Sequence, residues 1–478
     1  MRAQYRSLAT LGMTRLLGST RLLGMTLVAT SALAANGIDV RRGEDTLVFG
    51  NCVPSLVVEN RSAETIDYLQ VDLVIALPSF NHASTIGSVL QAILAGLKVS
   101  FADASILIVN ADVGSQDGTP EIVKQTVGDL FPLSLVQPIG EGSAASPFAL
   151  NRLSYSGMPG QEDAFRSFFG ITARLKAKTC VVIDPSVRSV TSEWIALLAK
   201  PVFEKGADYV APVFCRPRYE GSLTNNLIAP LTQALYGKRV ACQVGGGYGF
   251  SQEMASFLAQ NDSFWQGDAA RFSVESWLTT VAVAQGYQVW QARLGTKVQD
   301  KKAGAADVST SLVQAVGASY HYMEQYQDVW EKQTGVSEIP EIGRPMDAEV
   351  GSASIQVERM MKGFRQGLRD LLPIWEVILA PETLASVLTL GLRDDDDFRF
   401  PLSLWVQTVY DFAVGYHEKV LHREHLLRSL MPLYLGRTAS VVLETRGGGP
   451  EEVQHTVEQG CQTFEAMKSY LVDRWRFQ

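Results

Sequence analysis

The sequence has few cysteines and no excess of basic residues. Its five cysteines among 478 residues are scattered and form no CxxC pair. Neither a zinc site nor a disulfide framework is therefore predicted, and a reduced, cytoplasmic setting is expected. The formal net charge is -8, whereas nucleic acids and anionic membranes bind basic surfaces. We expect no nucleic-acid partner.

Long apolar runs are also scarce. Beyond the N-terminus no segment approaches the roughly 20 unbroken apolar residues that cross a bilayer, so no membrane span is predicted. Residues 1–35 carry four arginines and no acidic residue, and they end in Ala32-Leu33-Ala34. We expect residues 1–38 to be a disordered leader or signal-like segment. If residues 1–35 are a genuine signal peptide, the protein would be exported instead.

The chain contains neither a GxGxxG loop nor a GxxxxGK[ST] loop, so neither a dinucleotide-binding fold nor a P-loop is supported. It does contain apolar runs that are followed by segments whose apolar residues recur at helical spacing. Val71–Pro78 precedes a helix over Ser84–Leu97, and Ser105–Val109 precedes a second helix. A third run, Val181-Val182-Ile183, stops at Asp184. Successive units of this kind predict an α/β fold with a parallel sheet.

Acidic residues follow these predicted strands. Asp112 and Asp184 each lie where an apolar run ends, and Asp117 precedes a helix that has Pro120 in its first turn. Ligands of open α/β sheets bind at the carboxyl ends of the strands, where a carboxylate accepts hydrogen bonds from a base or a ribose. The alternative for Asp117 is that it only caps the helix.

Several motifs occur in a specific order along the chain. They are Pro78-Ser79-Phe80-Asn81, Asn110–Thr119, Asp184–Ser189, Arg216–Asn225, Pro230–Arg239, Gly245–Ser251 and Val274–Thr280. The ordered set resembles GT-A glycosyltransferases, and in particular the retaining group of glucosylglycerate, mannosylglycerate and glucosyl-3-phosphoglycerate synthases. The resemblance implies a Rossmann-like, mostly parallel sheet flanked by helices over residues 71–302, after a lead-in over residues 39–70.

The rest of the chain is predicted to be helical. Apolar residues recur at helical spacing from Leu312 onwards, ending in an amphipathic helix over Glu451–Trp475, so residues 303–478 form a C-terminal helical region. The final helix packs on that region or makes a homodimer contact.

The resemblance also implies which residues bind the substrates. A nucleotide sugar, UDP- or GDP-linked, would contact one set of positions: Pro78, Ser79, Asn81, Asp112, Asp117, Gln161, Asp184 and Ser186. A small anionic acceptor such as glycerate or 3-phosphoglycerate would be bound by Arg216, Arg218, Thr224 and Asn225, because arginine pairs with planar anions in bidentate fashion. The alternatives are a solvated basic surface for the arginines and a helix cap for Thr224 and Asn225.

The sequence departs from the resembled group at polar positions. The D-x-D turn, which would hold Mg²⁺ or Mn²⁺, is Asp184-Pro185-Ser186, and a metal-binding histidine is replaced by Gln299. Only Asp184 and, weakly, Gln299 remain as metal ligands, so metal dependence is in doubt. An expected catalytic acid is replaced by Gly247. Glu275 is the remaining candidate for holding the sugar hydroxyls, with an ordinary helix-face acid as the alternative.

Three functions remain open. The first is an active hexosyltransferase that acts with retention of configuration and with altered or absent metal dependence. The second is a catalytically impaired homologue that serves as a binding or regulatory subunit. The third is an unrelated α/β enzyme that shares only the chemistry of the strand ends.

Overall fold

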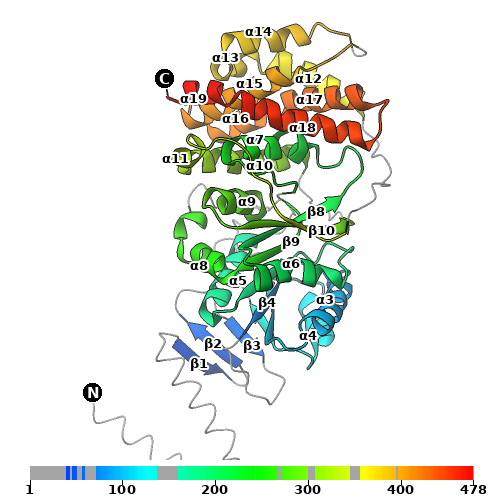
Figure 1. The fold of residues 1–478 in the computed structure, drawn as a ribbon, viewed down its shortest axis with the longest axis vertical. Helices are drawn as coiled ribbons and strands as arrows, with labels where there is room; N and C mark the ends of the chain where they lie inside the picture. The colour runs from blue at the N-terminus through cyan, green and yellow to red at the C-terminus, as the bar shows by residue number, and fades with distance from the viewer. Residues whose placement is uncertain are drawn as a thin grey trace, which may run out of the picture.

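The computed structural model describes residues 39–43, 46–50, 56–59, 71–136, 160–242, 244–266, 272–299, 307–344, 356–394 and 397–476. The predicted leader over residues 1–38 lies outside the described residues. The chain forms an α/β half built on one sheet and a C-terminal half made of stacked helices (Figure 1).

One sheet of eleven strands runs through the α/β half, in the order β1-β2-β3-β6-β5-β4-β7-β9-β8-β10-β11. Its centre, β6-β5-β4-β7, is parallel, and β9 is antiparallel to both of its neighbours. The strands are β1 Asp39–Gly43, β2 Thr46–Gly50, β3 Leu56–Glu59, β4 Leu73–Ser79, β5 Ile106–Asp112, β6 Leu133–Val136, β7 Thr179–Ile183, β8 Tyr209–Cys215, β9 Gly247–Ser251, β10 Val289–Thr296 and β11 Glu341–Ile342. The predicted fold class, a mostly parallel sheet flanked by helices, is confirmed.

Helices cover both faces of this sheet. In β4, Leu73, Ile75 and Leu77 face one hydrophobic core, while Val74 and Ala76 face another. A strand that is buried on both faces must be apolar throughout, which explains why β4 and β7 are continuous apolar runs in the sequence. The flanking helices are α3 Ile86–Ser100, α4 Thr119–Val127, α5 Gln161–Leu175, α6 Glu193–Lys205, α8 Gln252–Gln260 and α9 Val274–Ala284.

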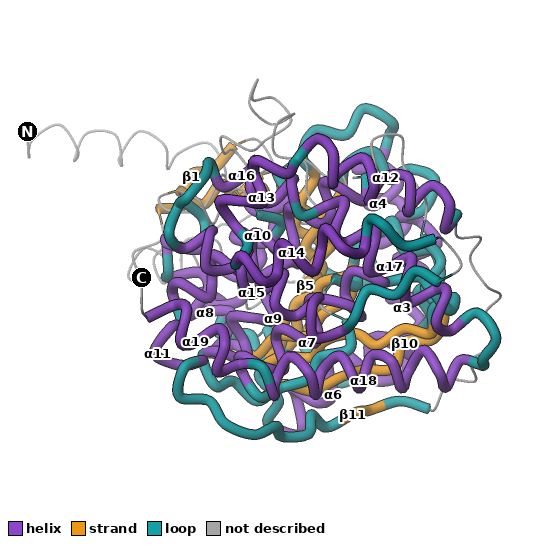
Figure 2. The backbone as a smooth tube through the Cα atoms, turned by 90° about the horizontal axis from the view of Figure 1, so that it is seen from above, coloured by secondary structure: helices purple, strands orange, loops and turns teal. Residues whose placement is uncertain are grey.

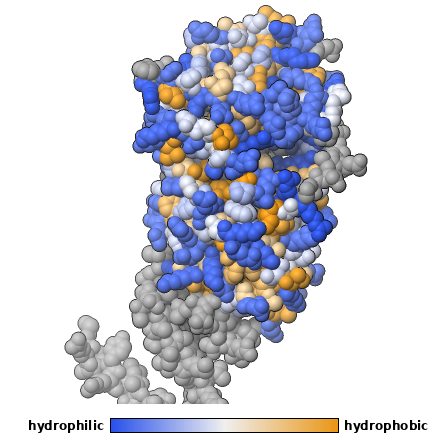
Figure 3. Space-filling model, viewed as in Figure 1, coloured by the Kyte–Doolittle hydropathy of each residue, from blue (hydrophilic) through white to orange (hydrophobic). Residues whose placement is uncertain are grey.

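The C-terminal helices form a layer over one end of the α/β half. Seen from above in Figure 2, they lie over the strands, and their apolar side chains share one continuous core with the face of the sheet that carries Val74 and Ala76. Hydrophilic side chains cover most of this layer on the face drawn in Figure 3. The helices are α7 Ala229–Tyr236, α10 Val308–Gln325, α11 Gln327–Trp330, α12 Val357–Asp370, α13 Leu372–Ile378, α14 Pro381–Leu390, α15 Leu402–His417, α16 Arg423–Ser429, α17 Met431–Thr445, α18 Pro450–Ala466 and α19 Lys468–Arg476.

Two boundaries differ from the sequence interpretation. The final amphipathic segment is two helices, α18 and α19, which meet at Met467. Strand β11, which lies within the region predicted to be helical, pairs with β10 and extends the sheet. The α/β half therefore receives a strand from beyond residue 302.

Candidate functional site

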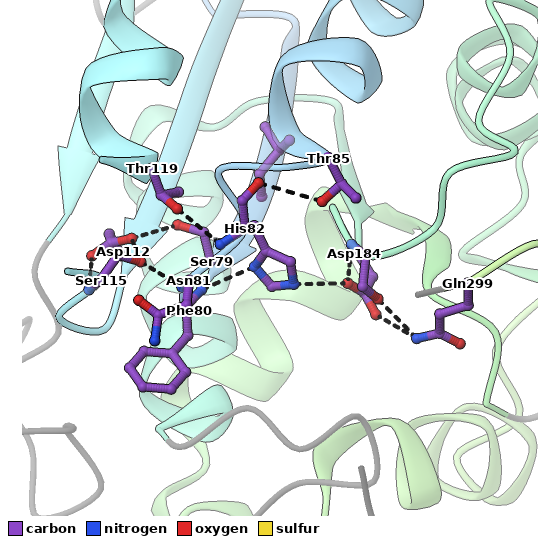
Figure 4. A network of polar contacts seen from close by, with 12 residues as sticks. Ser79, Phe80, Asn81, His82, Thr85, Asp112, Ser115, Thr119, Asp184 and Gln299 are labelled. Atoms are coloured by element: carbon purple, nitrogen blue, oxygen red, sulfur yellow. Dashed lines mark hydrogen bonds and ion pairs between the residues drawn. The ribbon is translucent and has the colours of Figure 1, made fainter. Parts of the chain in front are cut away.

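The carboxyl end of β5 is organised around Asp112. Its carboxylate accepts hydrogen bonds from the hydroxyls of Ser79 at 2.9 Å and Ser115 at 2.6 Å, and from the backbone N–H groups of Gly114 and Ser115 at 3.1 and 2.8 Å (Figure 4). Ser79 ends β4, so Asp112 ties two neighbouring strand ends together. Both carboxylate oxygens of Asp112 accept hydrogen bonds from the protein itself, so Asp112 holds the ends of β4 and β5 and the loop after β5 together.

The loops after β4 and β5 are joined by two further side chains. Asn81, in a left-handed conformation at φ 54°, accepts a hydrogen bond from the Gln116 N–H at 2.9 Å. Asp117 accepts bonds from the Ala83 N–H at 2.9 Å and from both the N–H and the hydroxyl of Thr119. Partial burial raises the pKa of Asp117, but these hydrogen bonds outweigh it and lower the pKa. The structure thus favours the helix-capping interpretation of Asp117. Pro78 lies inside β4 and is buried.

Asp184, at the end of β7, lies at the centre of the candidate site. Its N–H donates to the Gly246 carbonyl at 2.8 Å, and its Oδ1 accepts the Ser186 N–H at 2.8 Å. Gln299 donates its amide to the Ser186 hydroxyl at 2.8 Å and lies 3.4 Å from Asp184 Oδ2. Figure 4 shows His82, Asp184 and Gln299 side by side. The sequence had placed Asp184, Ser186 and Gln299 in one site, and the structure brings these three side chains together.

His82 was missed by the sequence interpretation, which ended the motif at Asn81. The ring is buried, and its Nε2 lies 4.0 Å from Asp184 Oδ1. Its Nδ1 accepts the Phe80 N–H at 3.0 Å, so Nδ1 offers a lone pair and Nε2 carries the proton that faces Asp184. An imidazole immediately after the polar turn at the end of a strand was the signal available in the sequence.

Glu275, in the first turn of α9, lies next to this centre and is only 3% exposed. Tyr248 donates its hydroxyl to Glu275 at 3.1 Å and accepts the Gly245 N–H at 2.7 Å. Burial, and then the negative charge of Asp184, raise the pKa of Glu275 from 4.5 to about 7, while Lys297 and hydrogen bonds from Tyr248 and Gln161 oppose the rise. Glu275 is therefore a buried carboxyl close to half-ionised at neutral pH.

Gln161 lies beside Glu275 as the first residue of α5. It is 3% exposed, and its Oε1 has no hydrogen-bond partner within the part of the chain that the structure describes. An unpartnered buried carbonyl costs about 1–3 kcal/mol. The Gln161 carbonyl is thus able to accept a hydrogen bond from a further hydroxyl or N–H donor.

The glycines of the Gly245–Gly247 segment face different surroundings. A Cβ on Gly247 would meet Trp194 in the core at 3.1 Å, whereas one on Gly246 would lie 3.1 Å from the Asp184 Cβ. Gly246 precedes β9 and has a left-handed φ of 80°, and a Cβ there would also lie 3.0 Å from the buried Val187 Cγ2. The structure thus places Gly247, the predicted catalytic position, against the core and Gly246 beside Asp184.

The donor set does not fit Mg²⁺ or Mn²⁺. Within the described ranges no three His, Cys, Asp or Glu side chains come together as metal ligands. His82 uses the Nδ1 lone pair on a backbone N–H, and Gln299 turns its amide donor toward Ser186 and Asp184. Mg²⁺ takes an octahedral set of oxygen ligands, made of one or two carboxylates together with water and substrate phosphates. Asp184 is the single carboxylate of this group.

Three of the four residues predicted to bind an acceptor, Arg216, Arg218 and Asn225, line a cavity of about 1050 Å³ beside the ends of β8 and β10. Its wall includes four arginines, Arg216, Arg218, Arg239 and Arg293, together with Asn225. Phe214 also lines it, and the Lys297 ammonium lies 5.6 Å from the Phe214 ring. Lys297 also acts on Glu275, so this cavity lies next to the Asp184 centre.

The predicted acceptor residues differ in how many hydrogen bonds their side chains already make within the protein. Arg216 donates to the Cys242 thiol at 2.8 Å and to the Val244 carbonyl at 3.4 Å. Arg218 donates to the Thr445 carbonyl in the C-terminal layer and covers the Tyr219 ring. Thr224 begins a π-helical turn, Thr224–Ile228, and does not line the cavity. Arg216 and Asn225 are the better placed of the predicted set.

Comparison with known proteins finds similarity only among solved structures. No family model and no curated protein matches the chain. Glucosyl-3-phosphoglycerate synthase from Mycobacterium tuberculosis is 17% identical, covers 56% of this chain and 86% of its own, and has a TM-score of 0.37. Mannosyl-3-phosphoglycerate synthase from Rubrobacter xylanophilus is 19% identical, covers 55% and 77%, and also has a TM-score of 0.37. The resemblance predicted from the sequence is confirmed.

This similarity concerns the fold, and a shared fold does not fix an activity. The mycobacterial synthase has been solved in complex with Mn²⁺, UDP and phosphoglyceric acid, and these ligands are properties of that protein. For the present chain, no helix among the described residues is long and apolar enough to pass through a membrane.

One consequence of the buried carboxyl is a pH-dependent stability. Because the folded pKa of Glu275 is raised from 4.5 to about 7, the folded chain binds the proton more tightly, and stability is lost as pH rises through this window. Glu275→Gln is expected to remove this loss. At pH 8 the free energy of unfolding of the variant should be higher than that of the parent by on the order of 3 kcal/mol. At pH 4 the two should be equal.

Urea unfolding of both proteins across this pH range measures the difference. Glu253→Gln serves as the control, because Glu253 is exposed on α8. A Glu275→Gln advantage that is the same at pH 4 and pH 8 would contradict the raised pKa.

Proposed function

We propose that the protein is a nucleotide-sugar-dependent hexosyltransferase that acts on a small anionic acceptor. The observation that carries the proposal is the convergence of Gln161, Asp184 and Glu275 at the carboxyl edge of the sheet, beside a cavity rich in arginine. Two buried groups with hydrogen-bonding capacity for hydroxyls lie next to cations suited to phosphates and carboxylates.

The proposed reaction breaks the bond between the sugar C1 and the diphosphate oxygen and forms a bond between C1 and an acceptor hydroxyl oxygen. The hydroxyl proton passes to the leaving phosphate oxygen on the same face, which gives retention and releases a nucleoside diphosphate. Glu275 and the Gln161 carbonyl would hold sugar hydroxyls. These contacts position C1 against the acceptor, and such positioning supplies a large part of transferase catalysis.

The acceptor would lie in the cavity beside Arg216 and Asn225. Arginine recognises carboxylate and phosphate by paired N–H bonds, which suits glycerate and 3-phosphoglycerate. Lys297, between this cavity and Glu275, would attract both the acceptor anion and the leaving diphosphate.

The second candidate function, a catalytically impaired binding or regulatory subunit, is favoured by one observation. Among the described residues Asp184 is part of no group of three metal-ligating side chains, and the neighbouring His82 ring uses Nδ1 to accept a backbone N–H. Nucleotide binding without transfer is the result that distinguishes this function from the transferase.

Isothermal titration and a transfer assay test the proposal. UDP-glucose or GDP-mannose is expected to bind with a Kd in the micromolar range, about -8 kcal/mol. One of the two, with glycerate or 3-phosphoglycerate, should release UDP or GDP together with a glycosylated acid. If neither nucleotide sugar binds, the transferase and the binding subunit are both excluded. Binding without product in any combination selects the impaired homologue.

A further inference from the structure

The charges around Asp184 bear on how the leaving diphosphate would be neutralised. We infer that this site holds the diphosphate of a nucleotide sugar with cations of the chain itself and without a divalent metal ion. The inference rests on the proposed function and concerns the same site.

The first support is the state of the Asp184 carboxylate. One oxygen accepts the Ser186 N–H and the other faces the Gln299 amide donor, at 2.8 and 3.4 Å. These N–H donors stabilise the ionised carboxylate and occupy lone pairs that a cation would otherwise use. To bind a cation in the same place, Gln299 would have to turn its amide over and give up its donation to Ser186 at 2.8 Å.

The second support is the tautomer of His82. The Phe80 N–H, at 3.0 Å, occupies Nδ1, so the proton is on Nε2. A nitrogen that carries a proton donates hydrogen bonds and does not ligate a metal ion. His82 therefore presents an N–H to this site, which suits a phosphate oxygen and disfavours Mn²⁺.

The third support is the position of two cationic residues. The segments that hold Arg188 and Lys297 pair directly, through the Arg188 N–H to the Val298 carbonyl at 2.8 Å and an isolated bridge between Val187 and Gln299. Val187 is buried and Arg188 is exposed, so the pairing fixes the backbone at Arg188 on the segment after Asp184. Lys297 lies on the opposite segment and is close enough to lower the pKa of Glu275. Two cationic side chains can balance the charges of two phosphates.

Titration of the full chain with UDP and, separately, with GDP, each in excess EDTA and then in excess MnCl₂, tests the inference. The Kd of UDP is expected to change by less than about threefold between the two conditions, since one tenfold step corresponds to 1.4 kcal/mol. Lys297→Met should weaken UDP binding in EDTA by about tenfold to a hundredfold. Lys98→Met, which removes an exposed lysine from the last turn of α3, should leave the Kd unchanged.

The outcomes separate the two proposals. UDP or GDP binding that appears only with Mn²⁺ overturns the metal-free inference and leaves the transferase standing. Absence of nucleotide binding in both conditions overturns the proposed function itself, and the inference falls with it. Equal loss of affinity in the Lys297 and Lys98 variants overturns the assignment of Lys297.

A double variant gives an independent readout. Ser186→Asp with Gln299→His adds a carboxylate and an imidazole beside Asp184, the donor types that Mn²⁺ accepts. With UDP present, the double variant is expected to remove the paramagnetic resonance signal of free Mn²⁺, while the parent chain leaves it in place. If the parent chain removes the free Mn²⁺ signal to the same extent as the double variant, the inference is contradicted.

Discussion

Glu275→Gln is expected to lower the turnover number for hexose transfer by about a hundredfold to a thousandfold, while the Kd of UDP stays within about threefold. Glutamine has nearly the same shape and keeps the hydrogen bond from Tyr248, so the fold and the nucleotide subsite are preserved. The change removes the negative charge that would face the sugar as positive charge develops at C1. Steady-state kinetics and UDP titration measure the two quantities.

A charge-matched control is available in Glu253→Gln, since Glu253 is exposed on α8. Its turnover number should equal that of the parent chain. The parent's turnover should also rise with pH through about 7, as Glu275, whose pKa is about 7, becomes ionised, and this rise should be absent in Glu275→Gln. A variant with full turnover and an unchanged pH profile would leave Glu275 with a purely structural role.

The parallel core of the fold was readable from the sequence. Strands buried on both faces must be apolar throughout, so Val71–Pro78 and Val181-Val182-Ile183 could be recognised without any partner. The structure gives β4 as Leu73–Ser79 and β7 as Thr179–Ile183. Because parallel strands end at one edge, the proximity of Asp184 to the end of β4 followed as well.

The antiparallel strand β9 could not be predicted from its residues in the same way. Gly247–Ser251 contains two glycines, and its pairing with β7 and β8 depends on close backbone approach. A Cβ on Gly249 would lie 2.2 Å from the Leu198 carbonyl oxygen. Such a contact between distant parts of the chain leaves no local pattern in the sequence.

Roles within the site depended on partners that only the structure provides. Asp112 and Asp117 have the chemistry of ligand-binding carboxylates, yet both are occupied by hydroxyl and N–H donors of neighbouring loops. For Glu275 the sequence left an ordinary helix-face acid open as the alternative to a sugar-binding carboxyl, and burial beside Asp184 sets it apart from an exposed acid. Residue type suggests what a side chain can do, and its hydrogen-bond partners decide what remains available for a ligand.

Arg216→Gln is expected to raise the KM for an anionic acceptor by about tenfold to a hundredfold while the turnover number changes by less than about threefold. Arg216 lines the cavity, and its guanidinium is held in place by donation to Cys242 and Val244. A pre-positioned cation binds an anion without the cost of ordering a long side chain. Glutamine keeps an amide donor for the Val244 carbonyl and removes the charge.

The charge itself is isolated by two comparisons. Arg166→Gln removes an equal charge from an exposed pair with Asp262, and it should leave the KM unchanged, because separated surface charges are screened by salt. Glycerol, which lacks the carboxylate, should bind the parent and Arg216→Gln equally weakly. If the KM for glycerol rises in the variant as much as that for glycerate or 3-phosphoglycerate, Arg216 supports the cavity wall and does not recognise the anion. An unchanged KM for every acceptor would move the acceptor site away from this cavity, because Arg216 lines it.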